Sequence, residues 1–166
     1  MPDQRTRLLF VCLGNICRSP LAEGIFLHLA RQRGFADRFT VDSCGTGGWH
    51  SGDRPDRRAL AVANANGVDL PSRARQWNRK ADPESFDLIL AMDNSNREDL
   101  LVSGAPERKV RLMRSFDPTL ADADDRDLDV PDPYYGGDDG FQDVYEMLVS
   151  ACDGLLDELT EARADG

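Results

Sequence analysis

Short apolar runs alternate with longer stretches of helical periodicity along this chain. The apolar runs are rich in Leu, Val, Ile and Phe, which is typical of strands that a parallel sheet buries on both faces. We predict these strands at Arg7–Cys12, Phe39–Ser43, Asp87–Met92 and Lys109–Met113. The spacing of apolar residues predicts helices at Ser19–Arg33, Asp56–Asn66, Asn94–Ser103 and Phe141–Ala162. This alternation indicates an α/β fold, a three-layer domain with a parallel sheet between two layers of helices.

The length of the chain fits one domain. Its 166 residues can bury a sizeable core, and neither an internal repeat nor a linker divides them. We therefore expect residues 1–166 to form a single domain. Basic residues precede the apolar run Leu8–Leu13 as in a signal peptide, but the run is shorter than the roughly 7–15 residues of such a segment. No apolar run approaches the roughly 18 residues that a membrane span needs, so we expect a cytoplasmic protein without a membrane partner.

The charge of the chain argues against nucleic acid as a partner. The formal net charge is −10 and the pI is about 4.6, and the basic residues are spread among acidic ones. A nucleic-acid-binding protein would gather its basic residues in a patch or stripe. We expect the acidity to serve solubility, and any anion site to depend on local groups because the overall field repels an anion.

The cysteines indicate neither a disulfide scaffold nor a metal site. A secreted scaffold would be smaller and richer in cysteine. The four cysteines match no zinc-binding spacing, and the chain has only two histidines to add to them. We expect no metal and no other cofactor. The cysteines are Cys12, Cys17, Cys44 and Cys152.

The strongest chemical signal is the stretch FVCLGNICRSPLAEGIF around the end of the first predicted strand. Ser19 and Pro20 mark a helix start, with the serine as N-cap and the proline at the first helical position. The loop Leu13–Arg18 therefore leads its backbone N–H groups to a helix N-terminus, an arrangement that suits phosphate. Gly14 and Asn15 tolerate the positive φ that a tight anion-binding loop needs. The stretch predicts a phosphate-binding loop.

Two side chains make this loop a candidate catalytic centre. The guanidinium of Arg18 matches two phosphate oxygens at once. Cys12 lies where the positive field that binds a phosphate also favours the nucleophilic thiolate. Ser19 can donate its hydroxyl to that thiolate as it leaves a phosphocysteine. A buried structural cysteine beside a capping arginine is the alternative, but strand, loop and helix start together favour catalysis.

A third candidate lies far along the chain, in the run PDPYY. In an open α/β sheet, ligands bind beyond the carboxyl ends of the strands. The acidic loop Leu120–Pro133 and Asp93 both follow predicted strands and would meet there. Asp132 stands between Pro131 and Pro133, and a rigidly held carboxylic acid can protonate a phenolate leaving group. From the residues alone, a proline-rich surface turn explains the run equally well.

These motifs resemble the low-molecular-weight protein tyrosine phosphatase family. The resemblance rests on VCLGNICRSPLAEGIF and DPYYGG, with VDSCGTGGWH and FDLILAMDNSN between them, and it extends over nearly the whole chain. It implies a flavodoxin-like fold with a four-stranded parallel sheet, and an enzyme that hydrolyses phosphotyrosine in proteins. By resemblance, Cys12 is the nucleophile that forms a phosphocysteine, Arg18 binds the phosphate, and Asp132 is the general acid and base. We expect a monomer that acts on phosphotyrosine-containing proteins.

The resemblance also assigns the substrate pocket. Trp49 on one side and Tyr134 and Tyr135 on the other would form aromatic walls against the ring of the substrate. The remaining substrate-binding positions lie in the first loop: Leu13, Gly14, Asn15, Ile16, Cys17 and Ser19.

Two further assignments follow from the same resemblance. Asn15 and Ser43 match positions whose hydrogen bonds hold the loop in shape. Cys17 is either a small packing residue or the partner of a reversible disulfide that protects Cys12 from over-oxidation.

Three alternative functions stay open. Thioredoxin-linked arsenate reductases share this loop but need further cysteines after the third strand, and none lies between Cys44 and Cys152. Protein arginine phosphatases carry threonine where Ile16 stands, and an apolar residue there favours a phosphate ester. A non-catalytic phosphotyrosine-binding module would need neither the thiol of Cys12 nor the acid Asp132.

Overall fold

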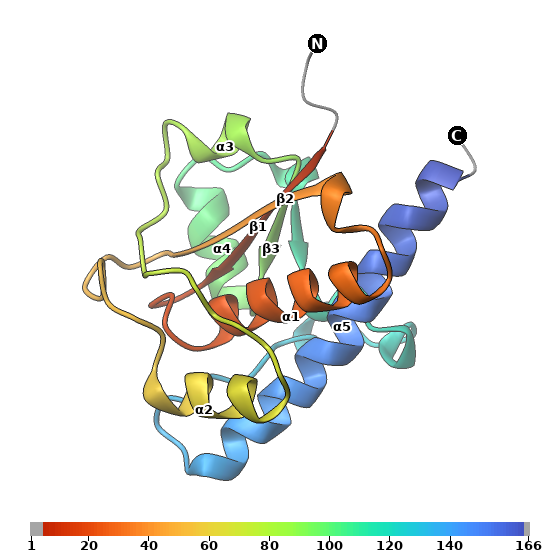
Figure 1. Ribbon diagram of the computed structural model, residues 1–166. Coiled ribbons are helices and arrows are strands. Elements are labelled where there is room, and N and C mark those ends of the chain that lie inside the picture. Colours follow the sequence, from red (N-terminus) through yellow and green to blue (C-terminus); the bar gives the residue numbers. More distant parts are fainter. Residues whose placement is uncertain (1–4, 165–166) are drawn as a thin grey trace.

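A sheet of four parallel strands, in the order β2–β1–β3–β4, forms the centre of the molecule (Figure 1). The computed structural model describes residues 5–164, so residues 1–4 and 165–166, which the single-domain prediction includes, lie outside the described residues. The sheet confirms the predicted fold class, and each strand overlaps one predicted apolar run. The strands are β1 (Thr6–Cys12), β2 (Phe39–Gly45), β3 (Leu88–Ala91) and β4 (Val110–Leu112).

Helices cover both faces of this sheet (Figure 1). Helices α1, α2 and α5 lie on one face and α4 lies on the other, where the short α3 precedes β3. The helices are α1 (Arg18–Gln32), α2 (Arg57–Ala65), α3 (Asp82–Ser85), α4 (Asn94–Val102) and α5 (Asp138–Ala164). Single turns of 3₁₀-helix join them: η1 (Ala36–Arg38), η2 (Glu107–Lys109), η3 (Met113–Phe116), η4 (Pro118–Leu120) and η5 (Asp125–Asp127).

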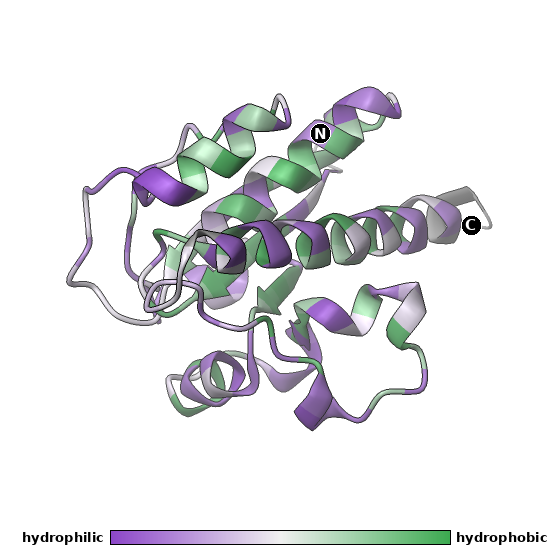
Figure 2. Ribbon diagram, turned by 90° about the horizontal axis from the view of Figure 1, so that it is seen from below, coloured by the Kyte–Doolittle hydropathy of each residue, from purple (hydrophilic) through white to green (hydrophobic). Residues whose placement is uncertain are grey.

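The two-residue period of a strand divides the core into two halves. In β1, Leu8 and Phe10 pack with the layer of α1 and α5, whereas Leu9 and Val11 pack with residues of β3, β4 and α4. All four of these side chains are fully buried. Figure 2 shows the green, hydrophobic strand segments enclosed by helices that carry both green and purple positions. Cys12 therefore lies at the end of a strand whose two faces are both covered.

The start of α1 differs from the prediction. Cys17 is the N-cap, no side chain caps the helix, and Ser19 is the second helical residue, so the predicted N-cap role of Ser19 is wrong. The reason is a competing set of partners, because the Ser19 hydroxyl lies 3.0 Å from Sγ of Cys12 and accepts a hydrogen bond from Asn15. The sequence also suggests that Glu23 adds acidic character to the first turn of this helix, but Glu23 lies beyond that turn, so this expectation is wrong.

Other boundaries differ for reasons of pairing and packing. Strand β2 continues to Gly45 because Gly45 pairs with Cys12 across the sheet. Helix α5 begins at Asp138, before the first apolar position Phe141 on which its prediction depended. It runs close to η3, and a Cβ on Gly154 would lie 1.9 Å from the carbonyl oxygen of Phe116. Among the described residues, no helix combines the length and apolarity needed to cross a membrane.

Candidate active site

The Cys12–Arg18 loop curls around the sulfur of Cys12 at the carboxyl end of β1. The backbone N–H of Asn15 donates to Sγ of Cys12 at 3.3 Å, and the Ser19 hydroxyl lies 3.0 Å from the same sulfur. Asn15 has a φ of 58°, in the left-handed region that asparagine enters more readily than most residues. Among the described residues Gly14 is not one of those with positive φ, so only Asn15 takes up the predicted conformation. One backbone donor and one hydroxyl group therefore contact the sulfur.

Several backbone N–H groups of this loop are available to a ligand. Within residues 5–164, the N–H groups of Leu13, Gly14, Ile16 and Cys17 donate no hydrogen bond. The N-terminus of α1 lies at the same place and adds the positive end of its dipole. Converging N–H groups at a helix N-terminus are suited to binding an anion such as phosphate.

The guanidinium of Arg18 is held from two sides. Its Nη1 donates to Oδ2 of Asp93 at 2.6 Å and to the carbonyl oxygen of Val130 at 2.9 Å. Its Nη2 lies 3.6 Å from Oδ2 of Asp132. Burial alone would lower the pKa of this group, but the charges of Cys12 and Asp93 outweigh the burial and raise the pKa. Arg18 is therefore a fixed cation in the loop.

Asp132 is brought to this loop from the opposite end of the sequence. Its Oδ1 accepts a hydrogen bond from the backbone N–H of Tyr134 at 3.0 Å. Arg58 of α2 donates to the carbonyl oxygens of Tyr134 and Gly136, at 3.0 Å and 3.3 Å. Helix α2 therefore holds the loop that carries Asp132, and the predicted carboxylic acid lies beside the predicted phosphate-binding arginine.

A cavity of about 230 Å³ opens above the sulfur. The predicted residues Asn15 and Ser19 do not line it, because their side chains lie beneath the loop. Trp49 and Tyr135, which are 65% and 89% exposed, form its outer walls. The cavity is lined by Cys12, Leu13, Gly14, Ile16, Cys17, Arg18, Trp49, His50, Asp132, Tyr134 and Tyr135.

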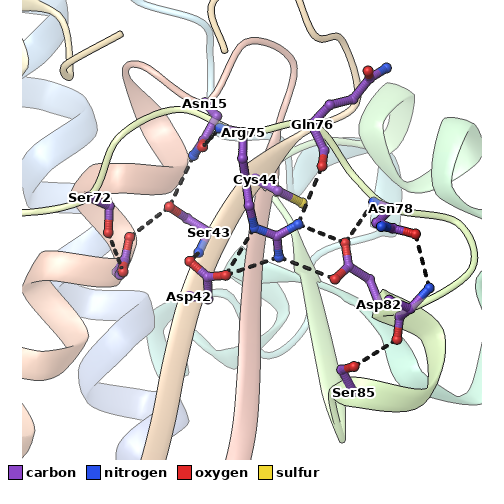
Figure 3. Close-up of polar contacts among 12 residues, drawn as sticks. Asn15, Asp42, Ser43, Cys44, Ser72, Arg75, Gln76, Asn78, Asp82 and Ser85 are labelled. Carbon is purple, nitrogen blue, oxygen red and sulfur yellow. Dashed lines mark hydrogen bonds and ion pairs between the residues drawn. The ribbon is translucent and has the colours of Figure 1, made fainter. Parts of the chain in front are cut away.

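A chain of hydrogen bonds supports the loop from below (Figure 3). The amide Nδ2 of Asn15 donates to the hydroxyls of Ser19 and Ser43, at 2.8 Å and 3.0 Å. Ser43 and Ser72 in turn donate to the two carboxyl oxygens of Glu23, at 2.6 Å and 2.7 Å. Burial raises the pKa of Glu23, and the two serine hydroxyls offset this only in part. Glu23 is thus the buried acceptor on which this chain of hydrogen bonds ends.

Arg75 ties the segment after α2 to the end of β2 (Figure 3). Its guanidinium donates to Asp42 at 3.0 Å and to Asp82 at 2.9 Å. Its backbone N–H donates to Oδ1 of Asn15 at 3.0 Å, and its carbonyl oxygen accepts from Gly45 at 2.8 Å. The side-chain amide that holds the loop is therefore itself oriented by a second segment.

Sequence reasoning missed the contributions of His50 and Arg58 to the site. His50 lines the cavity, its Nδ1 lies 3.2 Å from Oδ2 of Asp53, and a Cβ on Gly14 would lie 3.0 Å from its ring. His50 follows Trp49 at the end of the motif VDSCGTGGWH, and this position is the only sequence signal that points to it. Arg58 left no signal, because its partners are backbone carbonyl groups distant in sequence.

The four cysteines form no disulfide, and all are buried. Burial raises the pKa of Cys17, Cys44 and Cys152, so these three thiols stay protonated. Within the described part of the chain, no group of three or more His, Cys, Asp and Glu residues is placed to hold a metal ion. The arrangement can bind a tetrahedral anion, attack it with a sulfur and exchange a proton with a carboxyl group.

Comparisons with known proteins agree with this chemistry. A family model described as low molecular weight phosphotyrosine protein phosphatase matches residues 7–165. The low molecular weight protein-tyrosine-phosphatase of Streptomyces coelicolor is 44% identical over 158 residues, which cover 93% of this chain and 94% of that protein. The low molecular weight phosphotyrosine protein phosphatase of Sus scrofa is 38% identical over 164 residues, covering 96% and 99% of the two chains. A solved protein tyrosine phosphatase from Entamoeba histolytica has a TM-score of 0.87 and 37% identity, covering 95% and 99%.

Proposed function

This chain belongs to the low molecular weight phosphotyrosine protein phosphatase family, and from that premise we propose that it hydrolyses phosphotyrosine in proteins through a phosphocysteine on Cys12. One observation carries the proposal. Cys12, Arg18 and Asp132 line the same cavity, and Nη2 of Arg18 lies 3.6 Å from Oδ2 of Asp132. A nucleophile, a cation and an acid thus meet within reach of one phosphoryl group.

In the first step, the thiolate of Cys12 attacks phosphorus and the bond to the phenolic oxygen breaks. The loop N–H groups and Arg18 hold the phosphoryl oxygens, whose charge develops in the transition state. Asp132 gives its proton to the departing oxygen, because a phenolate is a poor leaving group at neutral pH. The products of this step are the dephosphorylated tyrosine and a phosphocysteine.

In the second step, water attacks the phosphocysteine and Asp132, now a carboxylate, accepts the proton of that water. The sulfur leaves as a thiolate, and the Ser19 hydroxyl and the N–H of Asn15 donate to it. Donors aimed at a departing anion lower the barrier to its departure. Inorganic phosphate is released and the enzyme returns to its starting state.

The walls of the cavity favour an aryl phosphate. Trp49, Tyr134 and Tyr135 offer ring surface on both sides of the entrance, and Ile16 adds an apolar contact inside. An aromatic ring gains from burial and from contact with other rings, whereas the short side chain of phosphoserine gains neither. An apolar Ile16 gives no hydrogen bond to a phosphorylated guanidinium. We propose phosphotyrosine, ahead of phosphoarginine and phosphoserine, as the substrate.

The direct test is turnover of phosphotyrosine peptides by the wild type and by Cys12→Ser. We expect the substitution to lower turnover by a factor on the order of a thousand or more. A serine hydroxyl stays protonated near neutral pH and is a far weaker nucleophile than a thiolate. The matched control is Cys152→Ser, since Sγ of Cys152 already lies 3.6 Å from the carbonyl oxygen of Ala22, where a hydroxyl can donate. Undiminished turnover by Cys12→Ser would rule out the phosphocysteine route.

The substrate class needs its own comparison. Matched peptides that carry phosphotyrosine, phosphoarginine or phosphoserine, assayed with the wild type, give the order of preference. An arsenate-reduction assay with thioredoxin covers the remaining alternative. Faster turnover of the phosphoarginine peptide would overturn the proposed substrate but leave the route through Cys12 intact.

A further inference from the structure

A second concavity lies directly beside the catalytic cavity. It has a volume of about 240 Å³ and shares two walls, Leu13 and Trp49, with that cavity. We call it the flanking hollow. Its lining residues are Leu13, Thr46, Gly47, Trp49, Trp77, Asp99 and Ser103.

The partition between the two concavities is the ring of Trp49. A Cβ on Gly47 would lie 1.7 Å from Cζ3 of Trp49, so the ring rests directly on the backbone of Gly47. Trp49 is still 65% exposed. Trp49 therefore presents apolar surface both to the catalytic cavity and to the flanking hollow.

The opposite wall, Trp77, is fixed by backbone pairing. Its N–H donates to the carbonyl oxygen of Gly45 at 2.8 Å, and the carbonyl oxygen of Arg75 accepts from Gly45 at 2.8 Å. The ion pairs of Arg75 anchor this segment further. The hollow is thus bounded on one side by a residue whose backbone is held in place.

Two residues that line the hollow each carry a buried polar atom without a hydrogen-bond partner. Four buried side-chain nitrogen or oxygen atoms among residues 5–164 lack a hydrogen bond, and two of them, Oγ1 of Thr46 and Nε1 of Trp77, belong to residues that line this hollow. Unpaired buried polar atoms are uncommon in native proteins and call for an explanation. An indole N–H is only a donor, so its natural partner is an acceptor such as a peptide carbonyl oxygen.

We propose that the flanking hollow binds an apolar side chain of the substrate, from a residue within two positions of the phosphotyrosine. This proposal rests on the proposed function, because the phosphotyrosine ring must occupy the neighbouring cavity. Leu13, Trp49 and Trp77 supply the apolar walls, and their continuity with the catalytic cavity fixes the occupant as the same polypeptide. The carbonyl oxygen of that substrate residue accepts a hydrogen bond from Thr46 or Trp77. The hollow makes the enzyme selective for sequence as well as for phosphotyrosine.

The test compares phosphotyrosine peptides that carry Leu or Gly at each of the two positions before and the two positions after the phosphotyrosine. The control substrate is p-nitrophenyl phosphate, which is too small to reach the hollow. We expect one position at which Leu raises kcat/KM by roughly tenfold over Gly, as one hydrophobic subsite does. In the variant Ser103→Phe the added ring fills the hollow, so that preference disappears while turnover of p-nitrophenyl phosphate is unchanged. The matched control is Ser85→Phe, because both serine hydroxyls donate to a carbonyl oxygen at a helix end.

Two further measurements separate the possible failures. Thr46→Val removes only the unpaired hydroxyl, and it should lower kcat/KM several-fold for peptides but not for p-nitrophenyl phosphate. If p-nitrophenyl phosphate is not hydrolysed, the proposed function is wrong, and peptide affinity for Cys12→Ser still reports on the hollow. Equal kcat/KM for Leu and Gly peptides at all four positions in the wild type would overturn the proposal. A preference that survives Ser103→Phe in the folded variant would do so too.

Discussion

Replacement of Glu23 by alanine tests whether the hydrogen bonds beneath the loop contribute to stability. Glu23 is 5% exposed, and its carboxyl group accepts hydrogen bonds from Ser43 at 2.6 Å and from Ser72 at 2.7 Å. The substitution leaves the Ser43 hydroxyl buried without an acceptor, which costs about 1–3 kcal/mol. Ser72 is half-buried and can turn to water, so its loss is smaller. We expect a total of about 2–3 kcal/mol, a fall in Tm of roughly 4–12 °C for a chain of this size.

The variant Glu23→Gln separates the charge from the hydrogen bonds. Burial raises the pKa of Glu23 in the folded protein above its value of about 4.3 in an unfolded chain. A group of this kind stabilises the fold only while it is protonated, so the wild type loses stability as the pH rises through the unfolded and then the folded pKa. Glutamine keeps an acceptor for Ser43 and a donor for Ser72, and it does not titrate.

The measurement is urea denaturation of both proteins at pH 4 and pH 7. We expect the unfolding free energy of Glu23→Gln, minus that of the wild type, to be larger at pH 7 than at pH 4. Only the wild type carries a buried carboxyl group that ionises over this range, and its ionisation lowers the stability of the fold. The same difference in unfolding free energy at both pH values would refute the reasoning, and so would a change of opposite sign.

Three other predictions concern catalysis, reactivity and packing. Asp132→Ala should slow hydrolysis of phenyl phosphate far more than that of p-nitrophenyl phosphate, because the better leaving group needs less protonation; equal losses in a steady-state assay would contradict the role of Asp132. Iodoacetate should alkylate Cys12 before Cys17 in the native protein, because burial raises the pKa of Cys17. Peptide mapping by mass spectrometry gives the order of labelling, and earlier labelling of Cys17 would contradict this prediction. Gly154→Ala should destabilise the fold by about 1–3 kcal/mol, because its Cβ would lie 1.9 Å from the carbonyl oxygen of Phe116; an unchanged Tm would mean that the backbone yields without cost.

The strands and long helices were predictable because their signal is local. A run such as Leu8–Val11 is apolar at every position, and only a strand covered on both faces buries all of it. The start of α1 was not predictable in the same way. Ser19 has the residue type of an N-cap, but its hydroxyl is engaged by Cys12 and Asn15, and that competition arises only once the loop has folded.

The residues of the candidate site also differ in how far the sequence predicts them, depending on whether their signal is local. Cys12 and Arg18 lie in one loop whose spacing carries the chemistry, so residue types alone pointed to them. Asp132 needed the family resemblance, because a carboxylate between two prolines has no chemical signature of its own. Glu23 and Arg58 were found only in the structure, since their partners lie on other elements and no spacing along the chain records such contacts.

The position of Arg18 between two carboxylates has a consequence for how substrate arrives. Asp93 and Asp132 both lie close to the guanidinium, and the chain carries a net charge of −10. The net negative charge of the protein therefore repels an anionic phosphopeptide at long range. At close range, the loop N–H groups and the guanidinium of Arg18 attract its phosphate. Salt screens the distant repulsion beyond a Debye length of about 8 Å at physiological ionic strength. The association rate with acidic phosphopeptides should consequently rise as salt is added at low ionic strength, opposite to the behaviour of an electrostatically steered enzyme.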